Sequence, residues 1–356
     1  TITSSKSENW LKKAQDAAWR GDQEEAISLS TAALATEPLE PALKIELYET
    51  LIYSLAADVQ LELALQKARE MFAFAEAQEN NIFQARALEA QALVFQTQGQ
   101  AAVALEKATA AAELVQNSAP TGLKARCAYR LGVNQHYAMA YQQALASAAK
   151  AQAMFKAQQD FGGEGRALEL EARIWNALKE TEKSRQLAES AFNLSRQAGD
   201  QLGMADAIVT IALCISDHAQ DTKMLNQALE LYQSAGYAPG IFRCFNNLSF
   251  AHYNLGLYRR ALRLITKAEG IARRAGSFSA LAFALTNRVN IEIAFRRSEV
   301  AEQLFSEFAD LVPKLGGLSV GSAVYVLPGR LALLKHDLPL AITSMKKAIA
   351  AAREVA

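Results

Sequence analysis

Four arginines recur at a spacing that could align their side chains. Arg86, Arg126 and Arg166 lie forty residues apart, and Arg243 follows at the equivalent position of a later repeat, described below. A guanidinium group presents its N–H donors as a planar fork that fits a carboxylate or a peptide carbonyl. The series could therefore bind a ligand. It could equally pair with acidic residues of its own or neighbouring repeats and orient them, and the sequence leaves both interpretations open.

The other reactive side chains form no catalytic or metal-binding pattern. The four histidines make no His-x3-His pair, and the three cysteines make no Cys-x-x-Cys pair. The stretch Gly-Gly-Glu-Gly-Arg (162–166) follows a predicted helix rather than a strand, which argues against a phosphate loop. We therefore predict no catalytic residue, no metal site and no cofactor, and we expect a chain that is not an enzyme. His136 and His252 are predicted to be packing or groove residues.

Composition indicates a helical globular protein. Of the 356 residues, 51% are hydrophobic and 21% are charged, which is typical of a folded chain. Alanine is abundant, and proline occurs only seven times. Lys plus Arg and Asp plus Glu both number 37, so the net charge calls for no polyanionic partner. No apolar run reaches the roughly 18–20 residues of a membrane span, and no signal peptide is visible, so we expect a cytoplasmic protein.

An internal repeat of about forty residues runs through the chain. Each repeat is identified by a pair of mostly small residues that lie seven positions apart on one helix face. The clearest pairs are Ala144/Ala151 and Ala261/Ala268. We call the first member of each pair the marker. The nine markers are Ala26, Ala64, Ala104, Ala144, Ser184, Asp221, Ala261, Ala301 and Ala341. Each unit is predicted to hold two helices, with the pair on the second. The predicted units cover residues 7–40, 41–81, 82–119, 122–161, 164–200, 201–238, 239–277, 278–316 and 318–356.

Glycine marks many of the predicted turns. It stands five residues before the marker at Gly21, Gly99 and Gly256, where we expect the turn between the two helices of a unit. Stretches between units that hold Gly, Asn or Asp are expected to close the second helix, with glycine in the left-handed conformation. These stretches are 77–81, 158–163, 196–200, 234–240, 273–277 and 314–317.

Two units depart from the pattern. The sixth has Asp221 in place of alanine at its marker, which predicts an irregular turn between its helices. The ninth has Pro328 in its first helix, and we expect this residue to weaken or bend that helix.

The repeat resembles the tetratricopeptide repeat family. Six residues of the first unit match that repeat's Trp, Gly/Ala, turn, Ala, Ala and Pro positions: Trp10, Ala14, Gly21, Ala26, Ala33 and Pro38. Tyr-Arg-Leu-Gly (129–132) and Asn-Asn-Leu-Ser (246–249) match its Leu-Gly site. The period of about forty exceeds the usual 34 residues, which indicates a variant with longer helices. The resemblance implies an all-α fold, a single right-handed superhelical solenoid of about nine antiparallel helix pairs.

In the family that the chain resembles, the first helix of each pair lines a concave groove. Its inward positions lie 18, 15, 11 and 8 residues before the marker. The groove residues that this register implies are Arg86, Glu89, Arg126, Tyr129, Arg166, Glu169, Arg173, Asn176, Arg243, Asn246, Phe250, Tyr253 and Asn290. The aromatic members could hold apolar side chains of a peptide, or they could serve only to pack one repeat on the next.

Charge is unevenly distributed along the chain. Residues 1–120 contain nine Lys and Arg against seventeen Asp and Glu, a difference of minus eight, whereas residues 241–297 contain ten against two, a difference of plus eight. Four basic residues recur at helical spacing and are predicted to form an outer basic stripe, away from the groove. They are Arg260, Arg263, Lys267 and Arg274. The asymmetry could drive association, or it could be ordinary variation of a helix surface.

Repeat arrays of this kind occur in bacterial signalling proteins, such as peptide-sensing regulators. The resemblance therefore implies a non-catalytic module that binds a peptide or protein segment and passes its occupancy to a fused C-terminal effector domain. The alternative is a freestanding scaffold that assembles, as a homo-oligomer or an adaptor, through its acidic N-terminal and basic C-terminal surfaces. We do not expect nucleic-acid binding, because the basic stripe and the groove aromatics are predicted on different faces. We expect no membrane partner.

Overall fold

The computed structural model describes residues 2–36, 38–116, 119–315 and 323–355, and its regular structure in these ranges is entirely helical. The all-α prediction is thus confirmed. The described helices form nine successive pairs. The first five are α1 (Ile2–Trp19) with α2 (Gln23–Leu34), α3 (Pro41–Ala57) with α4 (Leu61–Ala77), α5 (Asn81–Gln98) with α6 (Ala101–Leu114), α7 (Thr121–Tyr137) with α8 (Tyr141–Ala157), and α9 (Phe161–Ala177) with α10 (Thr181–Ala198). The others are α11 (Gln201–Leu213) with α12 (His218–Ser234), α13 (Ala238–Asn254) with α14 (Tyr258–Ala275), α15 (Phe278–Ala294) with α16 (Ser298–Leu311), and α17 (Ala323–Leu334) with α18 (Leu338–Val355). A short 3-10 turn, η1 (Val312–Leu315), follows α16.

The repeat marker is buried in every unit. Alanine markers are 2% exposed or less, and even the polar Asp221 is only 9% exposed. Where the second member of the pair is large, as at Met71 and Phe308, it is also fully buried. The pair therefore faces the layer between the helices, and alanine lets two helix backbones approach closely there. None of the described helices combines the length and the hydropathy that a membrane crossing requires.

The turns inside eight of the nine pairs share one backbone conformation. The residue five before the marker is left-handed at Gly21, Gly99 and Gly256, as predicted, with φ of 83°, 86° and 73°. In five other units L-residues take this conformation, with φ between 58° and 68°: Val59, Met139, Lys179, Arg296 and His336. This conformation costs an L-residue about 1–2 kcal/mol. Packing of the helix pair must outweigh that cost, so glycine alone could not have located every turn.

The predicted helix ends between units are correct at Gly199, Gly236 and Gly276, which are all left-handed. In the stretch 158–163 the expectation of a left-handed glycine was wrong. Gln159 takes that conformation, and Gly163 lies in the first turn of α9, where an added Cβ would overlap the ring of Phe155. Residues 316 and 317 of the last predicted stretch lie outside the described residues.

Units six and nine differ from the others. In unit six α11 ends at Leu213 and α12 begins at His218, so four residues separate helices that are usually separated by three. The predicted irregular turn is therefore present, and Asp217 caps α12 by accepting from the main-chain N–H of Ala219 at 2.8 Å. In unit nine α17 continues through Pro328 to Leu334. Because proline has no N–H, that helix loses one main-chain hydrogen bond at this point.

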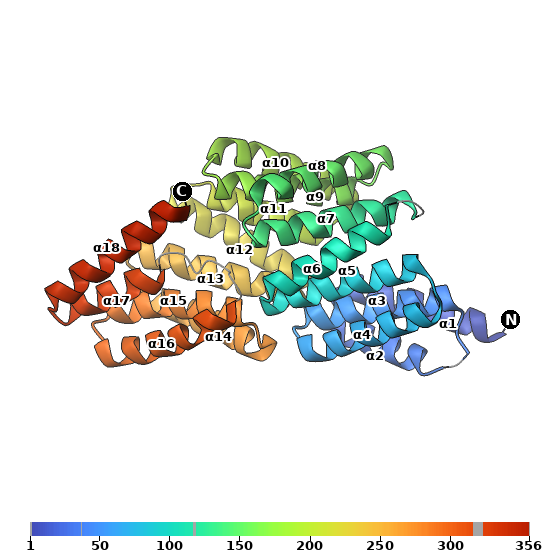
Figure 1. Cartoon of the computed structure of the whole chain (residues 1–356), viewed down its shortest axis with the longest axis horizontal. Coiled ribbons are helices and arrows are strands. Elements are labelled where there is room, and N and C mark those ends of the chain that lie inside the picture. The colour runs from blue at the N-terminus through green and yellow to red at the C-terminus, as the bar shows by residue number, and fades with distance from the viewer. Residues whose placement is uncertain (1, 37, 117–118, 316–322, 356) are drawn as a thin grey trace.

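The odd-numbered helices lie on the inner side of the curved array. Along most of the chain each contacts its odd-numbered successor, as α3 does α5 and α7 does α9, whereas successive even-numbered helices lie further apart. In Figure 1 the chain starts at α1 on the right, passes over α7 to α10 at the top and returns to α14 to α18 on the left. The inner positions predicted from the sequence all fall on odd-numbered helices.

The curvature brings turns from distant units into direct contact. The turn after α1 meets the turn after α12, where Gln23 Nε2 donates to the carbonyl of Ala235 at 3.1 Å. Gly21 and Gly236 face each other there, and a Cβ on either would overlap the main chain of the opposite turn. Only glycine allows two backbones to approach this closely.

A second contact of this kind joins the turn after α5 to the turn after α14. Ser277 Oγ donates to the carbonyl of Thr97 at 2.9 Å. Beside it, Ile271 and Ala275 of α14 are buried in the apolar core of units two and three. We call the two meetings the closure contacts. They connect units one to three with units six to eight and close the solenoid on itself, instead of leaving an open groove along its whole length.

Candidate functional site

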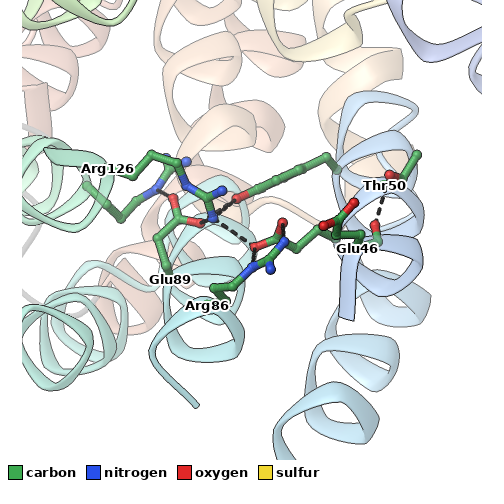
Figure 2. A network of polar contacts seen from close by, with 8 residues as sticks. Glu46, Thr50, Arg86, Glu89 and Arg126 are labelled. Carbon is green, nitrogen blue, oxygen red and sulfur yellow. Dashed lines mark hydrogen bonds and ion pairs between the residues drawn. The ribbon is translucent and has the colours of Figure 1, made fainter. Parts of the chain in front are cut away.

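Acidic residues already occupy the first part of the predicted arginine series. Arg86 on α5 forms a two-pronged ion pair with Glu49 on α3, with Nε to Oε1 at 2.9 Å. Arg126 on α7 reaches Glu49 at 2.8 Å and Glu89 of α5 at 3.2 Å, and these side chains converge between the helices (Figure 2). The sequence left two interpretations of the series open, ligand binding and pairing with acidic residues of the chain. In the folded chain Arg86 and Arg126 are paired with acidic residues of neighbouring repeats.

Glu89 is the centre of this first cluster. Its carboxylate also accepts from Arg130 Nε at 2.8 Å and from the hydroxyl of Tyr53, and the residue is 1% exposed. Burial alone would raise its pKa, but the positive charges of Arg130 and Arg126 and the Tyr53 hydroxyl lower the pKa of Glu89 to about 2. The carboxylate therefore stays ionised in the core and connects three inner helices.

A second cluster lies on α9 and α11. Arg166 pairs at 2.7 Å with Asp200, the residue that caps the N-terminus of α11. Glu169 accepts from Thr210 Oγ1 at 2.8 Å and lies 3.2 Å from Arg173 Nε. Burial raises the pKa of Glu169 and outweighs the stabilising charge of Arg173. This cluster likewise satisfies its charges within the chain.

The fourth arginine of the series, Arg243 on α13, pairs with Asp206 on α11 and contacts the Tyr232 hydroxyl. Tyr129 is close to the second cluster, and burial raises its pKa. Asn176 is half-buried at the end of α9. Ligand binding by these predicted groove residues stays a prediction, because their observed partners are residues of the chain itself.

Five polar inner residues occupy positions of the register but were not among the predicted groove residues. Subtracting 15 or 11 from the markers of units two and six, and 11 from the marker of unit nine, gives Glu49, Tyr53, Asp206, Thr210 and Arg330. In units two and six one member of the marker pair is not a small residue, and unit nine has a proline in its first helix. The first helices of these units nevertheless keep the register. The signal was thus present, because the register depends on the spacing between the two helices and not on the strength of the marker pair.

The predicted groove residues of units seven and eight lie apart from these clusters, around a cavity of about 230 Å³. Its lining comes entirely from α13, α15 and α17, and it includes Phe250, Tyr253, Asn254, Asn287, Asn290 and Arg330. Asn246 is adjacent, and its amide oxygen accepts from Asn287 Nδ2 at 2.9 Å. Phe250 is 52% exposed, which is high for a large apolar residue on an inner helix. The cavity thus combines amides, aromatic rings and one guanidinium.

The outer basic stripe lies on α14, and its four members Arg260, Arg263, Lys267 and Arg274 are all exposed. Lys267 Nζ lies over the ring of Phe245 at 5.3 Å from its centroid. Whether this stripe binds a partner remains a prediction. Elsewhere in the described residues, no group of three or more His, Cys, Asp or Glu side chains is placed to hold a metal ion.

We expect His136 to make stability depend on pH near neutrality. Its ring lies against Tyr137 and Tyr141, and burial, followed by the positive charge of Arg173, lowers its pKa from 6.5 to about 3. A depressed folded pKa means that the unfolded chain takes up the proton first as pH falls. Stability should therefore be full above pH 6.5 and decrease by about 1 kcal/mol per pH unit below it, towards pH 3.

Urea midpoints measured between pH 7.5 and 5 test this dependence. His136→Gln should flatten the profile, whereas the matched change His336→Gln at an exposed turn should leave it as in the wild type. Equal slopes in the wild type and His136→Gln would contradict the assignment.

Nine helix pairs in the described residues, with polar side chains on the inner helices, define a tetratricopeptide-like helical solenoid. No protein-family model matches the sequence, and no curated protein matches it. Solved structures share the fold. A Rap protein complexed with competence and sporulation factor has a TM-score of 0.68 at 12% identity over 99% of both chains. NprR in complex with its cognate peptide NprX has 0.60 at 12% over 96% of both chains. Aspartyl phosphate phosphatase F from Bacillus subtilis has 0.57 at 12% identity, over 96% of this chain and 93% of that one. At these identities the likeness shows the fold alone.

Proposed function

We propose that the chain is a non-catalytic regulatory module that binds a peptide or an extended protein segment on its inner face. The observation that carries the proposal is the cavity between α13, α15 and α17. Each asparagine side chain offers a donor and an acceptor, which is what the N–H and C=O groups of a peptide need. Phe250 and Tyr253 add apolar surface beside these amides, the usual combination in a ligand pocket.

The arginine series has a supporting role in this proposal. Because its members are paired with carboxylates of the chain, a ligand would have to break those pairs to use them. The cavity offers its polar groups at a smaller energetic cost. The solved NprR structure, which has the same fold, contains a peptide, and this supports a peptide as the ligand class. Occupancy would then be passed to an effector, either fused to the chain or separate.

Binding of a random peptide pool tests the proposal. The wild-type protein should retain a subset of octapeptides, identified by mass spectrometry after size-exclusion separation. Asn254→Ala and Asn287→Ala should each weaken the binding of the retained peptides about tenfold, since each removes one or two hydrogen bonds to the ligand. The matched change Asn226→Ala, on the exposed face of α12, should leave binding unaltered. Retention of no peptide, or equal loss in all three variants, would refute the proposal.

A further inference from the structure

The inner face of the solenoid carries a consistent pattern of charge pairing with one exception. Eight arginines lie on the odd-numbered helices within the described residues, and seven of them have a carboxylate of the chain as ion-pair partner. The eighth is Arg330 on α17. Its guanidinium donates to Tyr253 OH at 3.0 Å and to Asn290 Oδ1 at 2.5 Å, and both partners are neutral.

Arg330 is also the only charged residue that lines the cavity in the part of the chain that the structure describes. The side chain is half-buried, and a cation removed from water is poorly compensated by neutral acceptors alone. A guanidinium has five N–H donors, and hydrogen bonds to the described residues engage two of those of Arg330. With respect to that part of the chain, three donors remain to receive an anion, enough for the two-pronged geometry that carboxylates adopt with arginine.

The cavity is too small to enclose a whole ligand. Its volume of about 230 Å³ is below the roughly 300–1,000 Å³ of pockets that surround a drug-sized molecule. It suits one end or one side chain of a longer ligand, with Phe250 and the amides of Asn254 and Asn287 beside the charged group.

We propose that this cavity binds a carboxylate carried by the peptide ligand, and that Arg330 is the residue which selects for it. The proposal rests on the peptide-binding function proposed above. The carboxylate can be the C-terminus of the peptide or the side chain of an Asp or Glu, because both present the same two oxygens to the guanidinium. Tyr253 and Asn290 act as positioning residues, because they orient the Arg330 guanidinium so that its remaining donors point towards the cavity.

Three synthetic octapeptide pools built from uncharged residues test the proposal on the full chain. The first ends in a free carboxylate, the second in an amide, and the third in an amide but with one Glu at a varied internal position. Wild-type protein should bind the first or the third pool about ten- to hundredfold more tightly than the second, because a charge-assisted bond is lost in the neutral pool. The pool that is preferred identifies the source of the carboxylate.

Arg330→Gln should bind all three pools equally, and about as weakly as the wild type binds the neutral amide pool. Arg353→Gln, which changes an exposed arginine of α18, should keep the wild-type preference. Unchanged melting of Arg330→Gln establishes that the loss is one of recognition. Equal binding of the three pools by the wild type overturns this inference and leaves the proposed function intact. This comparison uses the wild-type protein alone. Failure to bind any pool overturns the proposed function and the inference with it.

Discussion

Replacement of Glu89 by alanine is expected to destabilise the protein by about 3–5 kcal/mol, the cost of leaving buried charges without their partner. Glu89 is the shared acceptor of Arg126, Arg130 and Tyr53, and it is 1% exposed. Arg126 would keep its contact with Glu49, but Arg130 has no second carboxylate among the ion pairs of the described residues. Urea unfolding followed by circular dichroism measures the effect.

Two further variants separate this network from ordinary surface pairing. Glu182→Ala removes a carboxylate that pairs with Arg185 on the surface of α10 and should leave the urea midpoint unchanged. Glu89→Met combined with Arg130→Met should lose less stability than Glu89→Met alone, because the second change removes the unpaired charge. If Glu89→Ala unfolds at the same urea midpoint as the wild type, the cluster around Glu89 does not hold the inner helices together.

The same carboxylate sets an expectation at low pH. Its folded pKa of about 2 lies below its usual value of 4.5, so its stabilising effect is complete above about pH 4.5 and is lost as pH falls towards 2. In Glu89→Gln the decrease in the urea midpoint between pH 5 and pH 3 should be smaller than in the wild type.

Gly236→Ala is expected to open the first closure contact. A Cβ at this position would overlap the carbonyl oxygen of Gly21 on the turn after α1, so the two turns must separate. We expect a loss of about 1–3 kcal/mol from the steric overlap, in addition to about 1–2 kcal/mol because alanine is unfavourable at a positive φ. Small-angle X-ray scattering should show a larger radius of gyration, because the turn after α1 is no longer held against the turn after α12.

Gly199→Ala provides a matched control for this change. Gly199 has φ of 69°, close to the 58° of Gly236, but a Cβ there would have no atom within 4 Å. The control should therefore lose only the conformational contribution and keep the wild-type radius of gyration. If both variants have the same radius of gyration and the same stability, the first closure contact does not determine the shape of the solenoid.

Much of the inner face was predictable from the marker register. The register correctly placed Glu89, Arg126 and Asn290 on inner helices, and its extension to the weaker units would have added Glu49, Asp206 and Arg330. The conformation of the turns was harder to predict. Val59 and Lys179 adopt a left-handed conformation that their residue types do not indicate, because packing between the helices imposes it.

By itself, the sequence determined the all-α repeat, its number of pairs and the residues on the inner helices. These properties are local. Two small residues seven positions apart indicate which face of their helix is buried, and this does not depend on the rest of the chain. Only the tertiary structure decided what the inner residues meet. Arg86 pairs with Glu49 across 37 positions, and Gln23 meets Ala235 across 212. Such meetings depend on the small rotation that each repeat adds to the one before it, and that rotation accumulates over many units. No local pattern encodes the sum. The sequence therefore left open that, among the residues the structure describes, seven inner arginines have carboxylate partners and Arg330 has neutral ones.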